Sequence, residues 1–367
     1  NYKVFEDKRV YSYEGEDVHH SKGLLCIDCH SSHEVMGDGK DYLHEEEAVS
    51  LNCSDCHFKD TPNTVAYDSL DVESALVFLH RKYQHQDKKM LAVKKDGHPL
   101  VNTFVDENDK AFLIGKKDGK LHPINKQGST CSRDHAHKNV SCSTCHAQWA
   151  PRCIGCHNSF EKNSKTAYDL LDKQYVGESW VEHVYEFLAD KPAMGVRVNE
   201  AGRKIEPAIP GMVLTIDHDS FDDDKKGTSF HRLYAPNSPH TITKKTRDCK
   251  SCHSNPAAIG YGKGQLIYDL SKGYGTWIFR ADYEINPNDG LPEDAWIPFL
   301  KKSNAKILST RTDFKPFSVD EQKQILLVGS CLQCHKDDSE IMQKSLKEGI
   351  EPLLLKISKA CVLPKFK

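Results

Sequence analysis

The strongest constraint on this chain is the pattern CxxCH, in which two cysteines flank two residues and a histidine follows at once. Two copies lie between Cys142 and His157, separated by six residues that include Pro151. The pattern is typical of c-type haem attachment. Two thiols at this spacing reach the two vinyl groups of one porphyrin, and the histidine is placed to bind the iron. So short a spacer predicts two haems in near contact.

The pattern occurs six times, numbered one to six in chain order, and uses 12 of the 14 cysteines. A zinc site pairs CxxC with another CxxC or a spaced histidine pair, and a disulfide framework does not need the histidines. We therefore predict six haem c groups. The cysteines predicted to form thioethers are Cys26, Cys29, Cys53, Cys56, Cys142, Cys145, Cys153, Cys156, Cys249, Cys252, Cys331 and Cys334. The predicted proximal iron ligands are His30, His57, His146, His157, His253 and His335.

A low-spin electron-transfer haem needs a second strong axial ligand. The chain has 20 histidines, so 14 remain for six distal positions, and bis-His ligation is expected. Methionine is the rival ligand, with five in the chain. The distal candidates, most of which stand shortly before a motif, are His19, His20, His44, His80, His135, His137 and His240. Held in reserve are His33, His85, His183, His218 and His231.

Composition shapes the expected fold. The chain is 38% hydrophobic and 28% charged over 367 residues, with a mean hydropathy of −0.62. Such a polar chain has trouble folding around its own side chains, whereas six porphyrins add large apolar discs. We expect a multihaem cytochrome c fold that is haem-cored and mostly irregular, with short α-helices and a few β-hairpins.

Charge and hydropathy also bound the partners and the location. The formal net charge is −3 before the haem propionates are added, which argues against nucleic-acid binding. No run of about 18 apolar residues is present, so no membrane span is predicted. Covalent haem attachment takes place outside the cytoplasm. We therefore expect a periplasmic or extracellular protein whose signal peptide has been removed.

The chain divides into five predicted segments. Residues 1–89 carry haems one and two, 90–127 form a β-hairpin insertion, and 128–174 hold the paired haems three and four. Residues 175–263 combine strands with haem five, and 264–367 hold haem six and a C-terminal helix. Turn signals Lys95-Asp96-Gly97 and Lys117-Asp118-Gly119 mark the insertion, which either caps porphyrin edges or contacts another subunit.

Helices are predicted at three places. Residues 68–86 form one helix whose apolar face includes His80. Ser318 and Glu321 form a capping box that opens a second, and the third spans about 338–360. Residues 180–188 are ambiguous between helix and strand. Cys131 and Cys361 lie outside the motifs, and their role stays open between a disulfide, a contact between subunits and free thiols, with a single thioether to haem or an iron bond as further alternatives for Cys131.

Three segments carry a family resemblance: Asp17 to His30, Asp134 to His146 with the CIGCH that follows, and Pro239 to His253. They resemble the secreted multihaem c-type cytochromes of bacteria and archaea that respire minerals or exchange electrons with other cells. The resemblance implies bis-His haems stacked as a continuous wire, and some of those cytochromes polymerise into filaments. Multihaem nitrite and tetrathionate reductases commonly use CxxCK at the catalytic haem, and no CxxCK occurs here.

Three functions are consistent with these patterns. The first is electron transfer to redox partner proteins or extracellular acceptors, without catalysis of its own. The second is a multihaem oxidoreductase that acts on a small nitrogen or sulfur compound at one open haem. The third is a homo-oligomeric filament subunit whose conduction follows from assembly.

Overall fold

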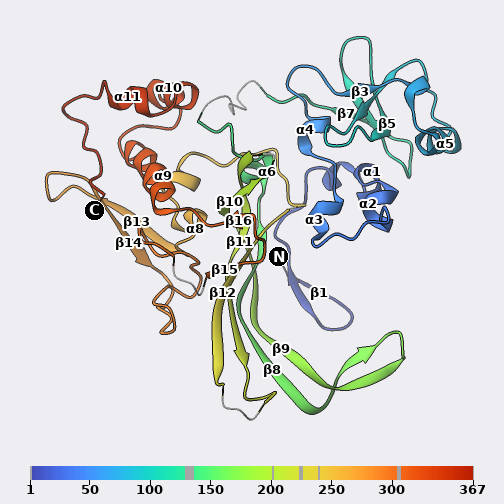
Figure 1. Ribbon diagram of the computed structural model, residues 1–367. Coiled ribbons are helices and arrows are strands. Elements are labelled where there is room, and N and C mark those ends of the chain that lie inside the picture. The colour runs from blue at the N-terminus through green and yellow to red at the C-terminus, as the bar shows by residue number, and fades with distance from the viewer. Residues whose placement is uncertain are drawn as a thin grey trace. The chain divides into compact units, whose positions relative to one another are not determined.

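The computed structural model describes residues 2–128, 136–200, 202–222, 226–238, 240–303 and 307–366. The chain forms two compact units (Figure 1). The smaller unit is Asp17–Cys131, and the larger combines Asn1–Glu16 with Ser132–Lys367. The finer division into five segments stays a prediction. No helix within the described ranges is both long and apolar enough to cross a membrane.

The smaller unit places short helices around motifs one and two and follows them with a five-stranded antiparallel sheet in the order β3-β4-β5-β6-β7. Its helical elements are η1 (His20–Lys22), α1 (Cys26–Cys29), α2 (Ser32–Met36), α3 (Glu45–Ala48), α4 (Cys53–Cys56), η2 (Tyr67–Ser69) and α5 (Val72–His80). Its strands are β3 (Thr64–Val65), β4 (Lys89–Ala92), β5 (Pro99–Val105), β6 (Ala111–Ile114) and β7 (Leu121–Ile124).

The larger unit is built on a seven-stranded sheet. Its main path is β15-β12-β11-β10-β16, and β8 pairs with β11 and with β9. The strands of the larger unit, in this sheet and outside it, are β1 (Tyr2–Val4), β2 (Val10–Ser12), β8 (Ala150–Asp169), β9 (Gln174–Asp190), β10 (Ala193–Asn199), β11 (Gly202–Asp217), β12 (Thr228–Pro236), β13 (Gly264–Asp269), β14 (Thr276–Ala281), β15 (Ile307–Ser309) and β16 (Phe314–Lys315). Its helices are α6 (Cys142–His146), α7 (Lys250–His253), α8 (Pro256–Ile259), α9 (Val319–Cys331), α10 (Glu340–Glu348) and α11 (Glu351–Leu354).

The larger unit has a core of its own side chains. Trp296, Tyr261 and Phe314 are at most 1% exposed, and the Tyr234 ring meets the Trp296 ring edge-on with centroids 4.1 Å apart. Aromatic pairs of this kind bury large apolar areas and favour such geometry. The sheet therefore packs on the protein's own side chains.

The predicted fold class is wrong. Strand accounts for 31% of the chain and helix for 21%, and β-sheets dominate instead of a haem-cored, mostly irregular chain with short helices. The error comes from averaging hydropathy over the whole chain. The buried aromatic residues gather in a few segments, including Tyr234, Tyr261, Trp277, Trp296 and Phe314, and a mean value does not register such clustering.

One of the helix predictions is confirmed and two are wrong. The Ser318 capping box is confirmed, because Ser318 N–H donates to Glu321 Oε2 (2.7 Å) at the start of α9. The predicted C-terminal helix is wrong in extent. It breaks into α10 and α11 at Gly349, whose φ of +85° ends the first helix. The helix predicted over residues 68–86 is shorter, because α5 covers only Val72–His80. Its predicted apolar face, which includes Leu76 and His80, is also wrong, since both are exposed while Phe78 is buried.

A buried ion pair ties the larger unit together. The Arg232 guanidinium, 1% exposed on β12, pairs with Asp289 and donates to the carbonyls of Leu291 (3.2 Å) and Glu293 (2.9 Å). Removal of one charge leaves the other uncompensated in a dry site. The pair therefore fixes the loop over 289–295 against the sheet.

We expect Asp289→Asn to lower the free energy of unfolding of the larger unit by about 3–5 kcal/mol, because it leaves the buried Arg232 guanidinium without a counter-charge. Urea unfolding followed by tryptophan fluorescence measures this, since Trp296 lies in that core. The matched control is Glu348→Gln at the exposed Lys344–Glu348 pair, where we expect a change within about 0.5 kcal/mol. Equal effects at the two positions would contradict the assignment.

Candidate haem-attachment sites

Motifs one and two form matching helical turns. His30 N–H donates to Cys26 O (2.9 Å) and His57 N–H donates to Cys53 O (2.7 Å). One helical turn places residues i, i+3 and i+4 on one face. The two sulfurs and the ring of each motif consequently lie on the same side, as a thioether-bound porphyrin with a proximal ligand requires.

An aspartate inside each of these motifs starts the turn. Asp28 Oδ2 accepts from Leu25 N (2.8 Å), and Asp55 Oδ2 accepts in the same way from Asn52 N (2.8 Å). Both carboxylates are buried, at 4% and 1% exposure. Each satisfies an N–H that a helix start leaves unpaired, which explains how a four-residue helix forms here.

Two hairpin turns of the sheet, between β4 and β5 and between β6 and β7, dock on these aspartates. Both turns have the sequence Lys-Lys-Asp-Gly, at 94–97 and 116–119. Lys94 N donates to Asp55 Oδ1 (3.2 Å) and Lys116 N donates to Asp28 Oδ1 (2.6 Å). Gly97 and Gly119 adopt φ values of +78° and +69°, which glycine tolerates best. The sheet therefore fixes the position of both motifs within the smaller unit.

Three motifs of the larger unit repeat the helical turn. Ser141 Oγ caps α6 by accepting from Thr144 N (3.2 Å), so motif three lies on a capped helix. His253 N–H donates to Cys249 O (2.9 Å) and His335 N–H donates to Cys331 O (2.9 Å), which forms the same turn at motifs five and six. Five of the six motifs thus share one backbone geometry.

Motif four is different, because it lies on strand β8. Cys156 and His157 pair with Leu214 and Thr215 of β11, and Gly155 has a φ of +83°. Adjacent side chains of a strand point to opposite faces, so Cys156 and His157 diverge in this conformation. The Cys153 side chain is not among those described. The sequence alone gave no sign of this difference.

Five motif histidines bind an oxygen through Nδ1. The acceptors are Glu34 Oε2 for His30 (3.1 Å), Asn125 O for His57 (2.7 Å), Thr243 O for His146 (2.8 Å), Thr215 Oγ1 for His157 (2.9 Å) and Ile325 O for His253 (3.0 Å). A histidine that donates from Nδ1 keeps the Nε2 lone pair for a metal, and such bonds orient metal-binding rings. This tautomer suits an axial iron ligand.

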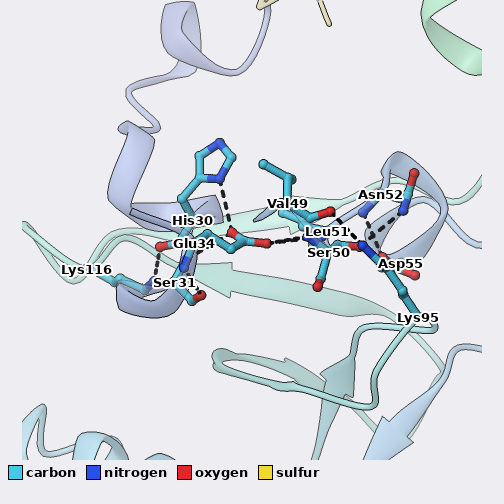
Figure 2. A network of polar contacts seen from close by, with 10 residues as sticks. All are labelled: His30, Ser31, Glu34, Val49, Ser50, Leu51, Asn52, Asp55, Lys95 and Lys116. Carbon is cyan, nitrogen blue, oxygen red and sulfur yellow. Dashed lines mark hydrogen bonds and ion pairs between the residues drawn. The ribbon is translucent and has the colours of Figure 1, made fainter. Parts of the chain in front are cut away.

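The buried Glu34 carboxylate connects motif one to the segment before motif two (Figure 2). It accepts from His30 Nδ1 and Ser31 N, and through Oε1 from Ser50 N (2.8 Å) and Leu51 N (3.2 Å). Burial opposes ionisation of Glu34, but the backbone N–H groups and His30 outweigh it and hold its pKa below the usual value. The carboxylate is therefore charged when it orients the His30 ring.

Three motif histidines have a second histidine close by. The ring centroids lie 6.0 Å apart for His19–His57, 6.2 Å for His137–His253 and 6.3 Å for His157–His183. Two metal–nitrogen bonds of about 2 Å, plus about 1.1 Å from nitrogen to ring centre on each side, give about 6.2 Å. These separations match two rings that bind one iron from opposite sides.

Electrostatics at His253 also suits metal binding. Burial lowers the pKa of His253 to about 4, against the effect of its bond to Ile325 O, and His137 lowers it further. Burial likewise lowers the pKa of His137. Both rings are therefore neutral at pH 7, the state that can donate a lone pair to iron.

The other distal candidates are placed as follows. His20 and His240 are exposed, His44 is half-buried at the start of α3, and His80 is exposed at the end of α5. His135 lies outside the described residues. Within those residues, the structure brings His19 and His137 beside motif histidines of other motifs. His183, one of the reserve candidates, lies opposite His157 in the β8–β9 register.

Burial disfavours the thiolate form of several motif cysteines. Cys249, Cys252, Cys331, Cys334 and Cys361 form no disulfide. Burial raises the pKa of Cys56 to about 12, and the nearby Cys29 adds to the rise. Burial also raises the pKa of Cys29, Cys252 and Cys331. Low-pKa thiolates are needed for dithiol exchange, so this chemistry is disfavoured. Among the described residues, no group of three or more histidine, cysteine or acidic side chains could hold a metal ion.

Packed segments link the motifs of the larger unit. Arg247, just before motif five, donates its N–H to Cys145 O of motif three (2.9 Å). Motif six ends α9, which accepts from His253 Nδ1 at Ile325 O. A Cβ on Gly329 would lie 2.2 Å from His253 O, so α9 approaches motif five as closely as only glycine permits.

Comparison with protein-family models, curated proteins and solved structures finds no match to this chain. The attachment sites therefore stand on their sequence and geometry alone.

Glu34→Ala tests the network of Figure 2. We expect amide exchange at Ser50 and Leu51 to accelerate about tenfold or more, because leaving a donor unpaired costs about 1–3 kcal/mol. Hydrogen–deuterium exchange with peptide-level mass spectrometry measures it. Glu45→Ala on exposed α3 is the control and should leave both amides protected. Unchanged exchange in Glu34→Ala would show that the carboxylate does not hold the segment.

Proposed function

We propose that this protein transfers electrons outside the cytoplasm through six covalently attached c-type haems, most of them with two histidine ligands. The observation that carries the proposal is the set of three histidine pairs at 6.0–6.3 Å, each with one member inside a CxxCH motif. The resemblance to secreted multihaem cytochromes belongs to the same proposal. Partners are redox proteins or extracellular acceptors.

The chain's residues would position these groups. Each iron, when bound, gives and takes single electrons. Helical turns hold two cysteines and a histidine on one face, and backbone or side-chain oxygens fix the histidine rings through Nδ1. At motif four the support is the His157–His183 pair, whereas its extended backbone does not fit attachment as it stands.

The spacing of the motifs supports a relay in each unit. Cys29 lies close enough to Cys56 to raise its pKa, so motifs one and two are neighbours. In the larger unit, Ile205 O of β11 accepts from Ser141 N before motif three (2.9 Å), and the same strand pairs with motif four. Motif three then contacts the segment before motif five, and motif five contacts α9. Neighbouring redox centres suit stepwise electron transfer.

The experiment that tests the proposal is native mass spectrometry of protein secreted by a host that matures c-type cytochromes. We expect the polypeptide mass plus six haems. The bare polypeptide mass would end the proposal. A mass with five haems, with peptide mapping showing unmodified motif four, would limit it to the helical motifs.

Single substitutions test the histidine pairs. We expect His19→Ala, His137→Ala and His183→Ala each to convert one low-spin haem to high-spin, because each removes the second axial ligand of one iron. Electron paramagnetic resonance of the ferric protein counts such haems. His218→Ala is the matched control: His218 Nε2 bonds a serine hydroxyl (Ser229, 3.0 Å) as His183 Nε2 does (Ser159, 3.4 Å), but only His183 has a ring contact with a motif histidine among the described residues. An unchanged spectrum in all three variants would refute the pairing.

A second function, reduction or oxidation of a small nitrogen or sulfur anion, is favoured by one cavity. This cavity of about 860 Å³ in the smaller unit is lined by Arg81, Lys82, Lys88 and Lys116, with no carboxylate among its lining residues. The Tyr83 hydroxyl on its wall is buried and has no hydrogen-bond partner. Lys116 also donates from Nζ to His30 O (3.4 Å), which places the cavity next to motif one.

Titration calorimetry with sulfite and nitrite tests this alternative. If an anion binds in the cavity, Lys116→Gln and Tyr83→Phe should each weaken binding about tenfold, as expected when a charge-assisted or buried hydrogen bond is lost. Lys117→Gln, at the exposed neighbouring position, should not. Carbon monoxide binding to the reduced wild-type protein would add the open iron that catalysis needs, and its absence would leave only an anion site.

A further inference from the structure

A small apolar cavity adjoins motif six in the larger unit. Its wall includes Cys331 and His335 of the motif, Met342 of α10, and Cys361 near the end of the chain. The rest of the wall is mainly aliphatic, from Ile341, Ile350, Leu353, Leu354, Ile357 and Leu363. One face of motif six is therefore covered by the C-terminal helices.

The covering segment offers no histidine. No histidine follows His335 in the sequence, and His335 is the only one in the cavity wall. Two sulfur side chains take that place, Met342 and Cys361. Met342 is 4% exposed and is the only methionine after Met212. A thioether buried beside a predicted proximal histidine is a ready iron ligand.

We propose that Met342 supplies the second axial ligand of the haem at motif six, which gives this haem His/Met rather than bis-His ligation. The inference rests on the proposed function, because it presupposes haem at Cys331 and Cys334. It deepens that function, because methionine raises the reduction potential of a haem relative to a second histidine. Haem six is then more easily reduced than a bis-His haem such as the one proposed at motif five.

Chemistry favours Met342 over Cys361. A thiol binds iron well only as the thiolate, and a charge in an aliphatic pocket is costly. The thioether of methionine is neutral and needs no such charge. Met342 also lies within a formed helix, where Ser345 Oγ donates to Met342 O (2.7 Å) and fixes the backbone.

A haem at motif six requires the covering helices to move. The cavity holds about 30 Å³, far less than a porphyrin needs, so the layer of α10 and α11 must open to admit the ring. Gly349, with a φ of +85°, joins these two helices and provides a place to bend. The aliphatic wall would then lie against the porphyrin faces, which shields the iron from water.

Absorption spectroscopy of the ferric wild-type protein tests the proposal. We expect the weak red charge-transfer band of one methionine-ligated haem, which bis-His haems lack. Met342→Leu should abolish the band and produce one high-spin haem that binds carbon monoxide when reduced. Met342→His should abolish the band but keep all haems low-spin, with the potential of one haem falling to the range of the others. Met194→Leu is the matched control, since Met194 is 3% exposed in the core, and it should retain the band.

Mass spectrometry separates this proposal from the proposed function. Six haems without the red band, or a band that survives Met342→Leu, would overturn methionine ligation while leaving electron transfer intact. A low-spin signal lost in Cys361→Ser instead of Met342→Leu would overturn it in favour of the thiol. If the haems are missing from the mass, the proposed function itself fails. The Met342→His variant keeps the test decisive if Met342→Leu folds poorly.

Discussion

The hydrogen bond from a motif histidine's Nδ1 to a protein oxygen is the interaction on which the candidate sites depend. Five motif histidines make it, and four of the acceptors come from segments far away in sequence, such as Asn125 for His57 and Ile325 for His253, whereas Glu34 lies only four residues from His30. A ring held in this way presents Nε2 in one fixed direction. The fold therefore orients the rings of His57, His146, His157 and His253 with long-range contacts, while the CxxCH turn supplies only the local geometry.

The same contacts join the motifs to one another. Glu34 bridges His30 to the residues before motif two, and Ile325 belongs to the helix that carries motif six. His19 precedes motif one but lies beside the motif-two histidine, and His137 precedes motif three but lies beside that of motif five. These ring contacts bring neighbouring motifs together. The relay proposed above would then follow from how the rings are held rather than need a separate feature.

The sequence predicted what depends on neighbouring residues. The six motifs, the Lys-Asp-Gly turns and the Ser318 capping box are local patterns, and the structure places a turn or a helix start at the turn signals and the box. The sequence did not predict features that depend on strand register or on packing between distant segments. His183 meets His157 only through the β8–β9 pairing, and Met342 reaches motif six only because α10 folds back. The extended conformation of motif four likewise follows from its strand partners, which no spacing rule contains.

The corrected fold separates two sources of order. The sheet of the larger unit packs on Trp296, Tyr234 and Phe314, so its stability comes from apolar burial within the protein. The motif helices α1 and α4 have four residues each, well below the length at which an isolated helix is stable. They persist because buried Asp28 and Asp55 tie them to the hairpin turns of the neighbouring sheet. A rigid β-framework that presents short, tethered attachment turns explains how a chain of low mean hydropathy can fold and still keep its candidate redox sites at fixed positions.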